Sequence, residues 1–294
     1  MNIEKHNKTN DNDFKFSILI PTWNNLKYLQ LCISSIRKNS HFQNQIIVHV
    51  NEGNDGTIDW LNEQNDIDYT HSKENIGICY ALNISRSLLK TDYLVYMNDD
   101  MYVLPDWDKF LDEEIKSIGH NNFFLSSTMI EPVTSNPSAI ELNCGTDIEN
   151  FDEKKLLGSF SEIEKLDWNG ATWPPNIVHK NTWDLVGGYS IEFSPGMYSD
   201  PDFSMKLWQS GVRYFKGVSK SRVYHFAAKT TTKISKTKSD GYKLFIDKWG
   251  MSSKTFTDKF LRRGKPFSGS LSSPKIDFST KIKNTAKKFI NIFN

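Results

Sequence analysis

Hydrophobic and polar positions alternate in blocks over the first hundred residues. Short apolar runs with polar ends are typical of buried strands, whereas apolar positions three or four residues apart are typical of helices. Residues 26–38 have the second spacing, with Leu26, Leu29, Ile33 and Ile36 on one face. The predicted strands are Phe16–Pro21, Gln45–Val50, Ile67–Thr70 and Tyr93–Met97, and the predicted helices are Leu26–Lys38, Thr57–Glu63 and Ile76–Leu89. This alternation predicts an α/β domain with a mostly parallel sheet.

Polar clusters follow three of these predicted strands directly. They are Thr22–Asn24, Asn51–Asp55 and Asn98–Asp100. In open parallel sheets, ligands bind beyond the carboxyl ends of the strands. The sequence therefore predicts a ligand site where the three clusters meet.

Beyond residue 100 the pattern is less regular. It predicts a helix over Asp106–Ser117, a strand over Phe123–Ser127, a short helix over Asn181–Val186, and strands over Val212–Phe215 and Arg222–His225. The clearest element is a helix that begins near residue 200. Asp200 suits its N-cap, Pro201 its first helical position and Gly211 its end. For residues 131–170 the pattern predicts loops without a regular helix or strand.

Charge is divided unevenly along the chain, although the formal net charge is only +1. Residues 1–212 contain 16 Lys and Arg against 31 Asp and Glu, whereas residues 213–294 contain 20 against 4. Either the C-terminal part contacts an anionic partner, or a solvated basic face neutralises the acidic part. Ser279–Asn294 has the pattern of a basic amphipathic helix, with an apolar side formed by Ile282, Ala286, Phe289, Ile290 and Phe293. Such a helix can lie on an anionic membrane, dock on the domain or fray.

The composition is that of a globular protein, with 38% hydrophobic residues among 294. No apolar run approaches the roughly 20 residues of a membrane span, and the polar residues 1–13 predict a flexible tail without a signal-peptide pattern. Three widely spaced cysteines, Cys32, Cys79 and Cys144, indicate reduced thiols of a cytoplasmic protein. No dinucleotide or P-loop glycine motif occurs, and the basic tail has no nucleic-acid-binding motif. We therefore expect no nucleic-acid partner.

Asn98-Asp99-Asp100 follows the apolar strand Tyr93–Met97 and is the clearest candidate for chemistry. Mg²⁺ and Mn²⁺ are usually held by one or two carboxylates together with substrate phosphates. Taken alone, the pair of acids is more typical of an ordinary turn than of a metal site.

Four ordered stretches resemble the family 2 glycosyltransferases, whose fold is called GT-A. They are Ser-Ile-Leu-Ile-Pro-Thr-Trp-Asn (17–24), Asn-Glu-Gly-Asn-Asp-Gly-Thr (51–57), Glu-Asn-Ile-Gly-Ile-Cys-Tyr-Ala-Leu-Asn (74–83) and Met-Asn-Asp-Asp (97–100). A second block, Val-Gly-Gly-Tyr (186–189) followed by Tyr-Ser-Asp-Pro-Asp-Phe (198–203), resembles the acceptor half. The resemblance covers about residues 14–226. It implies an α/β fold of GT-A type, with a Rossmann-like, mostly parallel central sheet flanked by helices and followed by a basic C-terminal extension.

The domain organisation implied by this resemblance has three parts. A flexible N-terminal tail covers residues 1–13, and the GT-A glycosyltransferase domain covers 14–226. Within that domain, 14–100 form the nucleotide-sugar-binding half and 101–226 the acceptor half. Residues 227–294 form the basic extension.

Nucleotide-sugar binding is implied for Pro21, Thr22, Asn24, Glu52, Asn75, Gly77, Asn98 and Asp99. Pro21, Thr22 and Asn24 match residues that line the nucleotide pocket. The carboxylate that contacts the base in relatives falls at Glu52 or at its neighbour Asn51.

The resemblance implies that Asn75 and Gly77 shape the loop before the third helix, which would lie beside the base and ribose. A turn with a helix cap explains these two residues nearly as well. Asp100 matches the metal-binding acid of the family and Asn98 the first position of its motif, with Asp99 between them. The implied cofactor is Mn²⁺ or Mg²⁺.

Asp200 is the implied general base, because inverting sugar transfer needs a carboxylate to take the proton of the acceptor hydroxyl. Asp202 is a competing choice, and helix capping alone is a second explanation of Asp200. His225 is implied to ligate the metal or to contact the diphosphate, and imidazole suits Mn²⁺ better than Mg²⁺. The alternative is a structural histidine. The stretch Trp168–Trp173 predicts either an acceptor platform or core packing.

The resemblance implies an inverting, metal-dependent glycosyltransferase of glycan or surface polysaccharide synthesis. Its donor would be a nucleotide-diphosphate sugar and its acceptor an unidentified glycan or lipid-linked molecule. A cytoplasmic location is expected, with contact to the inner face of an anionic membrane through the basic C-terminus as a further option. The alternatives are a non-catalytic nucleotide-sugar-binding module and another nucleotide-dependent enzyme of doubly wound fold.

Overall fold

The computed structural model describes residues 3–10, 13–226 and 235–292. Its strands are β1 (Ile3–His6), β2 (Ser17–Trp23), β3 (Gln45–Asn51), β4 (Ile67–Ser72), β5 (Tyr93–Tyr96), β6 (Met101–Val103), β7 (Phe123–Glu131), β8 (Ile140–Glu141), β9 (Trp168–Asn169), β10 (Asn176–His179) and β11 (Tyr214–His225). Within the described residues they form one sheet in the order β1-β4-β3-β2-β5-β10-β7-β11-β6, with β8 beside β7 and β9 beside β11.

The four strands predicted within the first hundred residues are parallel to one another, as the sequence predicts. Strands β4, β3, β2 and β5 run side by side in one direction, and β7 and β11 form a second parallel pair. Between them β10 is antiparallel to both neighbours, so it joins the two parallel groups into one sheet. The carboxyl ends of β2, β3 and β5 therefore meet at one edge, where the polar clusters follow.

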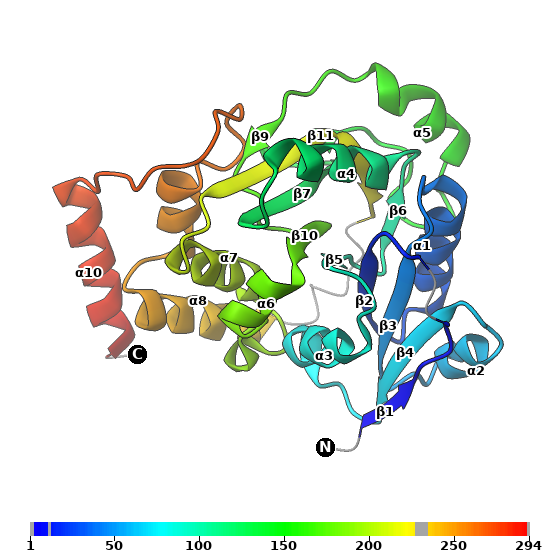
Figure 1. Ribbon diagram of the computed structural model, residues 1–294. Coiled ribbons are helices and arrows are strands. Elements are labelled where there is room, and N and C mark those ends of the chain that lie inside the picture. The colour runs from blue at the N-terminus through cyan, green and yellow to red at the C-terminus, as the bar shows by residue number, and fades with distance from the viewer. Residues whose placement is uncertain (1–2, 11–12, 227–234, 293–294) are drawn as a thin grey trace.

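Helices cover both faces of the sheet (Figure 1). They are α1 (Leu26–Asn39), α2 (Thr57–Asn62), α3 (Gly77–Ser85), α4 (Trp107–Ile118), α5 (Glu153–Ser159), α6 (Lys180–Val186), α7 (Ser199–Gln209), α8 (Ser235–Trp249), α9 (Ser253–Thr255) and α10 (Phe278–Ile292). Single helical turns cover Arg86–Leu88, Phe160–Glu162, Ile191–Phe193 and Phe256–Phe260.

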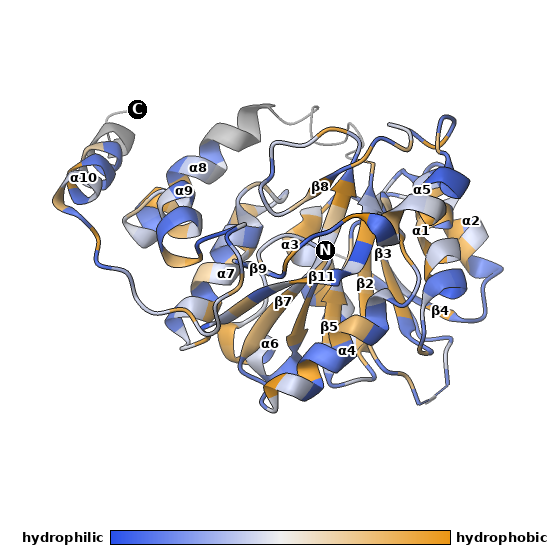
Figure 2. Ribbon diagram, turned by 90° about the horizontal axis from the view of Figure 1, so that it is seen from above, coloured by the Kyte–Doolittle hydropathy of each residue, from blue (hydrophilic) through white to orange (hydrophobic). Residues whose placement is uncertain are grey.

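Successive side chains of β2 point to opposite faces and enter different hydrophobic cores. Ile18 and Ile20 pack with residues of α1 and α4, whereas Leu19 packs with residues of α3, α6 and α7. Figure 2 shows hydrophobic residues concentrated along the strands of the sheet. Each large apolar side chain buried in this way contributes roughly 1.5–3 kcal/mol to folding. This burial on both faces explains why the central strands read as unbroken apolar runs.

One strand, β11, replaces the two strands predicted over Val212–Phe215 and Arg222–His225. The polar residues between them stay in the sheet because their side chains find partners. The ammonium group of Lys216 lies 2.6 Å from a carboxylate oxygen of Glu114 and 2.8 Å from one of Asp167. Buried charges need such pairing, and the partners lie too far away in sequence for a local pattern to reveal them.

Strand β1 lies in the segment for which the sequence predicts a flexible tail. It pairs with β4, and the chain that follows it is fixed by a carboxylate. The backbone N–H groups of Lys8 and Thr9 donate to Asp68 at 2.7 and 2.9 Å, and Asp68 is fully buried. A buried carboxylate needs such donors, so the described part of residues 1–13 is attached to the sheet.

The described C-terminal residues share a core with the rest of the molecule. Phe245, Phe256 and Leu261 are fully buried in the same hydrophobic cluster as Trp208 and Phe215. This packing places the loop after Phe260 beside β9 and β11. No helix in the described residues is long and apolar enough to cross a membrane.

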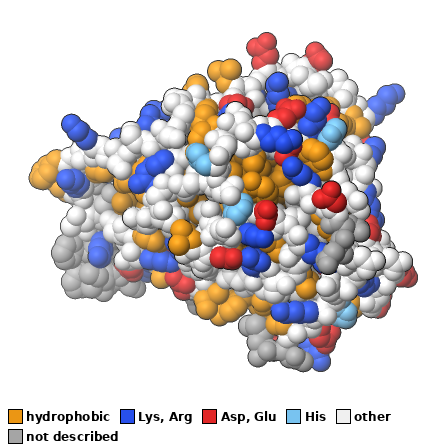
Figure 3. Space-filling model, in the orientation of Figure 1, with side chains coloured by type: hydrophobic (Ala, Val, Ile, Leu, Met, Phe, Trp, Pro, Cys, Tyr) orange, Lys and Arg blue, Asp and Glu red, His pale blue; other side chains and the backbone are white. Residues whose placement is uncertain are grey.

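Helix α10 lies at the outer edge of the molecule (Figure 1). Asn284 attaches it by accepting a hydrogen bond from Thr255 Oγ1 at 3.1 Å. Phe278 is 78% exposed and Ile282 is 52% exposed, and hydrophobic atoms are visible at this edge in Figure 3. Of the apolar side predicted from the sequence, the side chains of Phe289, Ile290 and Phe293 lie outside the described residues.

Candidate functional site

The larger of the two cavities described here opens at the carboxyl ends of the central strands and has a volume of about 780 Å³. Of the residues predicted from the sequence, Pro21, Thr22, Asn75, Gly77, Asn98, Asp99, Asp100, Asp200 and His225 line it. They come from segments as far apart in the sequence as β2 and β11. The edge of the sheet where ligands were expected is therefore hollow and is lined by the expected acids and amides.

Asn24 and Glu52, both predicted to bind the nucleotide, are not among the lining residues. The amide of Asn24 donates to Glu52 Oε2 at 2.9 Å, so the two side chains bridge their loops at the exposed surface. Their neighbours Asn25 and Asn51 line the cavity instead. Asn51 Oδ1 accepts a hydrogen bond from Ile76 N at 2.8 Å. Of the two residues proposed for base contact, Asn51 is thus the one that reaches the cavity.

The loop before α3 closely approaches the loop before α7. Gly77 has a φ of +77°, and a Cβ atom added there would lie 2.7 Å from Pro195 Cα. Ile78 N donates to Pro195 O at 3.0 Å, and Asn75 Oδ1 accepts from Gly77 N at 2.9 Å. Asn75 is therefore part of a turn that holds the loop, and only glycine fits at position 77. Both Gly77 and Pro195 line the cavity, so this contact joins two loops at its wall.

Asp99 and Asp100 lie side by side where β5 ends. Thr22 Oγ1 donates to Asp99 Oδ2 at 2.6 Å, which links the ends of β2 and β5. Burial and the adjacent charge of Asp100 raise the pKa of Asp99 to about 7. Neighbouring buried acids repel each other when both are ionised, so this position favours a cation.

His225 lies between two carboxylates. Its Nδ1 is 2.9 Å from Glu131 Oε1, and its Nε2 is 3.6 Å from Asp100 Oδ1. Burial by itself would lower the pKa of His225, but the charges of Asp100 and Glu131 outweigh it and raise the pKa. A hydrogen bond from Nδ1 to Glu131 directs Nε2 toward Asp100, as in metal sites where a carboxylate orients a histidine ligand.

These residues fit a divalent cation that shares its coordination with phosphate oxygens. Asp100 and His225 offer one carboxylate and one imidazole, and Glu131 orients the imidazole. No group of three or more His, Cys, Asp or Glu side chains in the described part of the chain is arranged to hold a metal alone. Mg²⁺ and Mn²⁺ sites that act on phosphates often take one or two protein ligands, with substrate and water supplying the others.

Asp200 lines the same cavity from the first turn of α7. The helix begins at Ser199, and no side chain caps it, so Asp200 is neither its N-cap nor a capping acceptor. The hydroxyl of Tyr189 lies 3.2 Å from Asp200 Oδ1. Burial raises the pKa of Asp200 to about 7, and the hydrogen bond from Tyr189 opposes that rise. A carboxyl group with a pKa near neutrality suits general-base chemistry.

Asp202, the competing candidate for the base, has a different environment. It is fully buried, does not line the cavity and contacts the C-terminal part of the chain. Its Oδ1 lies 2.9 Å from Lys248 Nζ and accepts a hydrogen bond from Trp249 Nε1 at 2.8 Å. Asp202 therefore connects α7 to α8 and is unavailable to a substrate.

The Trp/Pro/Gly-rich stretch divides between the two predicted roles. Trp168 is buried, donates from Nε1 to Thr128 Oγ1 at 2.9 Å and packs tightly on Gly217. Trp173, in contrast, lines the cavity. Core packing thus explains Trp168, whereas Trp173 is the tryptophan of this stretch that a ligand in the cavity can contact.

Three residues that were not predicted from the sequence also belong to the site or support it, namely Glu131, Tyr189 and Arg263. Glu131 ends strand β7, so the rule that ligands bind at strand ends could have found it. Tyr189 follows a Gly-Gly pair within the recognised acceptor block. Arg263 lies in the C-terminal part and carries no local signal.

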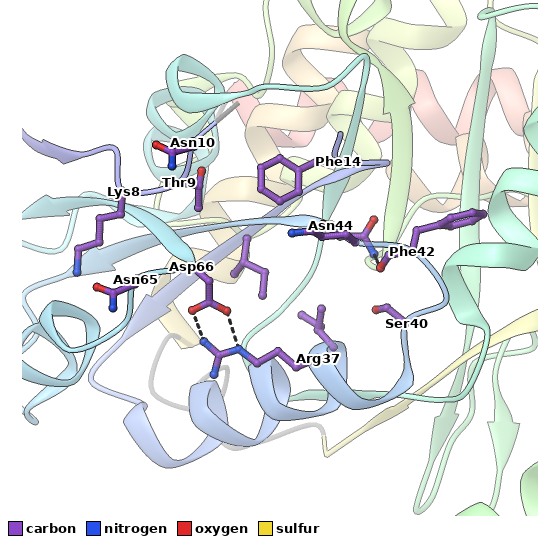
Figure 4. Close-up of a pocket in the computed structure, with 13 residues that line it drawn as sticks. Lys8, Thr9, Asn10, Phe14, Arg37, Ser40, Phe42, Asn44, Asn65 and Asp66 are labelled. Carbon is purple, nitrogen blue, oxygen red and sulfur yellow. Dashed lines mark hydrogen bonds and ion pairs between the residues drawn. The ribbon is translucent and has the colours of Figure 1, made fainter. Parts of the chain in front are cut away.

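A second, smaller cavity of about 340 Å³ lies near the N-terminus (Figure 4). It contains the ion pair between Arg37 and Asp66, with a nitrogen–oxygen distance of 2.6 Å. Lys8, Phe14 and Phe42 also line it. Its acid is already paired, and it lies near the amino ends of β2, β3 and β4, not near their carboxyl ends. We therefore assign the site to the larger cavity.

Comparisons with known proteins bear on the family and the fold. Residues 17–159 match the model of the family described as Glycosyl transferase family 2. No curated protein matches the sequence. Among solved structures, S. aureus TarS 1–349 in complex with UDP has a TM-score of 0.56 and 13% identity over 95% of this chain and 72% of that chain.

Two further structures show how widely the fold is shared. The TarS chain of S. aureus has a TM-score of 0.54 and 12% identity over 96% of this chain, which spans 44% of that longer chain. GalNAc-T7, solved with UDP, GalNAc and Mn²⁺, has a TM-score of 0.55 and 15% identity over 72% of this chain and 44% of that chain. At these identities the likeness establishes the fold, which is that of the GT-A glycosyltransferases.

Proposed function

Because residues 17–159 belong to glycosyl transferase family 2, we propose that this glycosyltransferase moves a sugar from a nucleotide diphosphate to an acceptor hydroxyl with inversion. The observation that carries the proposal is the convergence of Asp100, His225 and Asp200 on one cavity. The acids that follow β5 and the carboxylate of Asp200 in α7 line the same cavity. The acids suit a cation that can stabilise a negatively charged leaving group, and Asp200 suits the role of a proton-accepting base.

In the proposed reaction, Asp200 takes the proton of the acceptor hydroxyl as its oxygen attacks the anomeric carbon. The bond from that carbon to the diphosphate breaks, and the nucleoside diphosphate departs from the opposite face. Tyr189 orients the carboxylate through its hydroxyl at 3.2 Å. The single displacement inverts the configuration and needs no covalent intermediate.

We infer that Asp100 and His225 hold Mn²⁺ or Mg²⁺. When bound, the cation supplies positive charge that stabilises the leaving diphosphate. Glu131 fixes the ring of His225, and Thr22 fixes Asp99 beside the same position. Pro21, Asn51, Asn75 and Gly77 form the wall on the nucleotide side.

A hydrolysis and binding screen tests this function directly. The protein is incubated with UDP-, GDP- and dTDP-sugars in the presence of Mn²⁺, Mg²⁺ or EDTA, and release of the nucleotide is measured. We expect one donor class to be cleaved or bound only with a divalent cation, and UDP-sugars are the first choice because two structural relatives were solved with UDP. If no donor binds or reacts under any condition, the enzymatic proposal fails.

Replacing Tyr189 by Phe is expected to shift the pH dependence of turnover. Burial raises the pKa of Asp200 and the Tyr189 hydroxyl lowers it. Without the hydroxyl the pKa rises further, so the acid side of the kcat profile moves to higher pH, by up to about one unit. Rates at pH 6 should fall more than rates at pH 8.5. An unchanged pH profile in the variant would refute the positioning role of Tyr189.

The acceptor in this proposal is a glycan or a lipid-linked molecule of surface polysaccharide synthesis. The three cysteines are all unpaired and buried, which supports a reducing, cytoplasmic setting. A non-catalytic binding module is the remaining alternative. It would bind a donor with the metal and show no turnover with any acceptor.

We infer in addition that α10 brings the protein to an anionic membrane surface. Exposed Phe278 and Ile282 lie on the same side of this lysine-rich helix. Sedimentation with vesicles of phosphatidylglycerol, compared with vesicles of phosphatidylcholine, tests this. We expect binding to the anionic vesicles alone and its loss in a Phe278→Ser, Ile282→Ser variant. Equal sedimentation of the wild type with both vesicles, or with neither, would exclude the contact.

A further inference from the structure

An arginine from the C-terminal part of the chain enters the wall of the catalytic cavity. Arg263 lines the cavity next to Trp173, and the centre of its guanidinium group lies 4.1 Å from the centre of the indole ring. A cation stacked on Trp is stabilised by the ring and keeps its edge available for hydrogen bonds. The pair forms a flat, positively charged surface inside the cavity.

The backbone around Arg263 is fixed to the acceptor half. Arg263 N donates to Thr257 O at 3.0 Å, and Gly264 N donates to Asn169 O at 2.9 Å. A Cβ atom added to Gly170 would lie 2.7 Å from Arg263 Cα, so the two backbones touch. Backbone hydrogen bonds and close packing therefore fix the position of Arg263.

The guanidinium group lacks a hydrogen-bonding partner among the described residues. Its Nε is buried without an acceptor, and no carboxylate of the described residues lies within ion-pair distance. Asp258 acts on its charge from farther away, but Lys254 pairs with that acid at 2.8 Å. Arg263 is only partly buried, and its two terminal Nη atoms are not among the buried atoms that lack a partner. These two nitrogens are therefore the donors that a ligand in the cavity can reach.

The position favours the acceptor over the donor as that ligand. Gly170 directly follows β9, which pairs with β11, and β11 is four strands from β2 in the sheet. With neighbouring strands about 4.8 Å apart, the strand that anchors this loop lies roughly 19 Å from the strand that carries Pro21 and Thr22. Trp173 lies nearer, because its carbonyl oxygen accepts a hydrogen bond from Ser126 of β7, which is three strands from β2. At least two strands, β5 and β10, therefore separate the nucleotide wall from the elements that hold Arg263 and Trp173.

We propose that Arg263 and Trp173 form an acceptor subsite that binds an anionic group, a phosphate or a carboxylate, carried by the acceptor. The inference rests on the proposed function, and it defines the acceptor class as negatively charged. Guanidinium binds both groups through paired hydrogen bonds, and the indole face adds a surface for an adjacent sugar or polyol. The excess of basic residues after position 212 is consistent with such a substrate.

Calorimetric titration tests the subsite with three ligands of one carbon skeleton. Glycerol 3-phosphate, glycerate and glycerol are each titrated into protein saturated with UDP and Mn²⁺, so that the donor diphosphate position is already filled. We expect the wild type to bind at least one of the two anions about tenfold or more tightly than glycerol. Which anion binds more tightly distinguishes phosphate from carboxylate.

Two variants of the same loop distinguish anion binding at the subsite from a general effect of positive charge. Arg263→Gln should lose the preference for the anion by about tenfold, while Arg262→Gln, which removes the same charge outside the cavity, should keep it. If both variants lose the anion preference equally, the subsite is refuted, because the general positive charge of the loop would then explain the binding. No preference in the wild type would overturn it as well.

Affinity for UDP, measured in the same variants, separates this inference from the proposed function. We expect Arg263→Gln to bind UDP as the wild type does. If UDP affinity falls and the anion preference stays, Arg263 serves the donor and the acceptor subsite is refuted. If the wild type binds none of UDP, GDP and dTDP, the proposed function fails, and the anion titration on the unloaded protein still decides whether Arg263 binds anions.

Discussion

Asp200→Asn is expected to reduce kcat for sugar transfer by about 10³-fold, because a positioned general base typically contributes 10²–10⁴-fold. The amide has nearly the same shape but cannot accept the proton of the acceptor hydroxyl. Affinity for UDP in the presence of Mn²⁺ should remain unchanged. Steady-state kinetics with the donor identified by the screen, together with calorimetry of UDP binding, measures both quantities.

The same substitution is expected to stabilise the folded protein above pH 7. Burial raises the pKa of Asp200 from 3.8 to about 7, so the folded state holds this proton more tightly than the unfolded state does. Stability therefore falls as pH rises from about 4 to about 7, and the full penalty is present above pH 7. Removing the charge recovers at most about 4 kcal/mol, less to the extent that water reaches the carboxylate. Thermal unfolding at pH 8 should show a higher Tm for the variant.

Asp202→Asn is the matched control, since it changes a carboxylate two residues away on the same helix. It weakens the buried contact with Lys248, which lies 2.9 Å away, so Tm should fall. Turnover should stay within a few-fold of the wild type. Retention of turnover in Asp200→Asn together with its loss in Asp202→Asn would reverse the assignment of the base.

Asp100→Ala is expected to remove most of the effect of a divalent cation on donor binding. The proposed site has only two protein ligands, and losing the carboxylate should weaken UDP affinity in Mn²⁺ by about 100-fold, at the upper end of the loss seen when supporting residues are removed. In EDTA, the wild type and the variant should bind UDP equally weakly. Calorimetry with and without Mn²⁺ measures the difference. An unchanged Mn²⁺ dependence would show that the cation binds elsewhere or is not used.

Glu131→Gln provides a graded companion to this experiment. The amide can still accept a hydrogen bond from His225 Nδ1, but it no longer carries the charge that helps to hold the ring. The Mn²⁺ dependence of UDP binding should therefore weaken by less than in Asp100→Ala. A larger loss in Glu131→Gln than in Asp100→Ala would identify Glu131 as the more important residue at the cation.

The sequence by itself determined the α/β order of the first hundred residues and the edge where the site lies. Buried parallel strands need continuous apolar residues, and polar ligand-binding residues follow them, so both features are local in sequence. This is why β2, β3, β4 and β5 and the lining residues Asp99 and Asp100 were predicted close to where they are found. The motifs that resemble glycosyltransferases lie in the same segments.

Only the tertiary structure decided which polar residues face the cavity. Asn24 and Glu52 bond to each other across two loops, and Asp202 pairs with Lys248, 46 positions later in the chain. A local pattern contains no information about partners that distant. The same holds for Arg263, which reaches the cavity because its loop packs on Gly170. Burial and pairing between remote segments fix the roles of these side chains, and those properties exist only once the chain has folded.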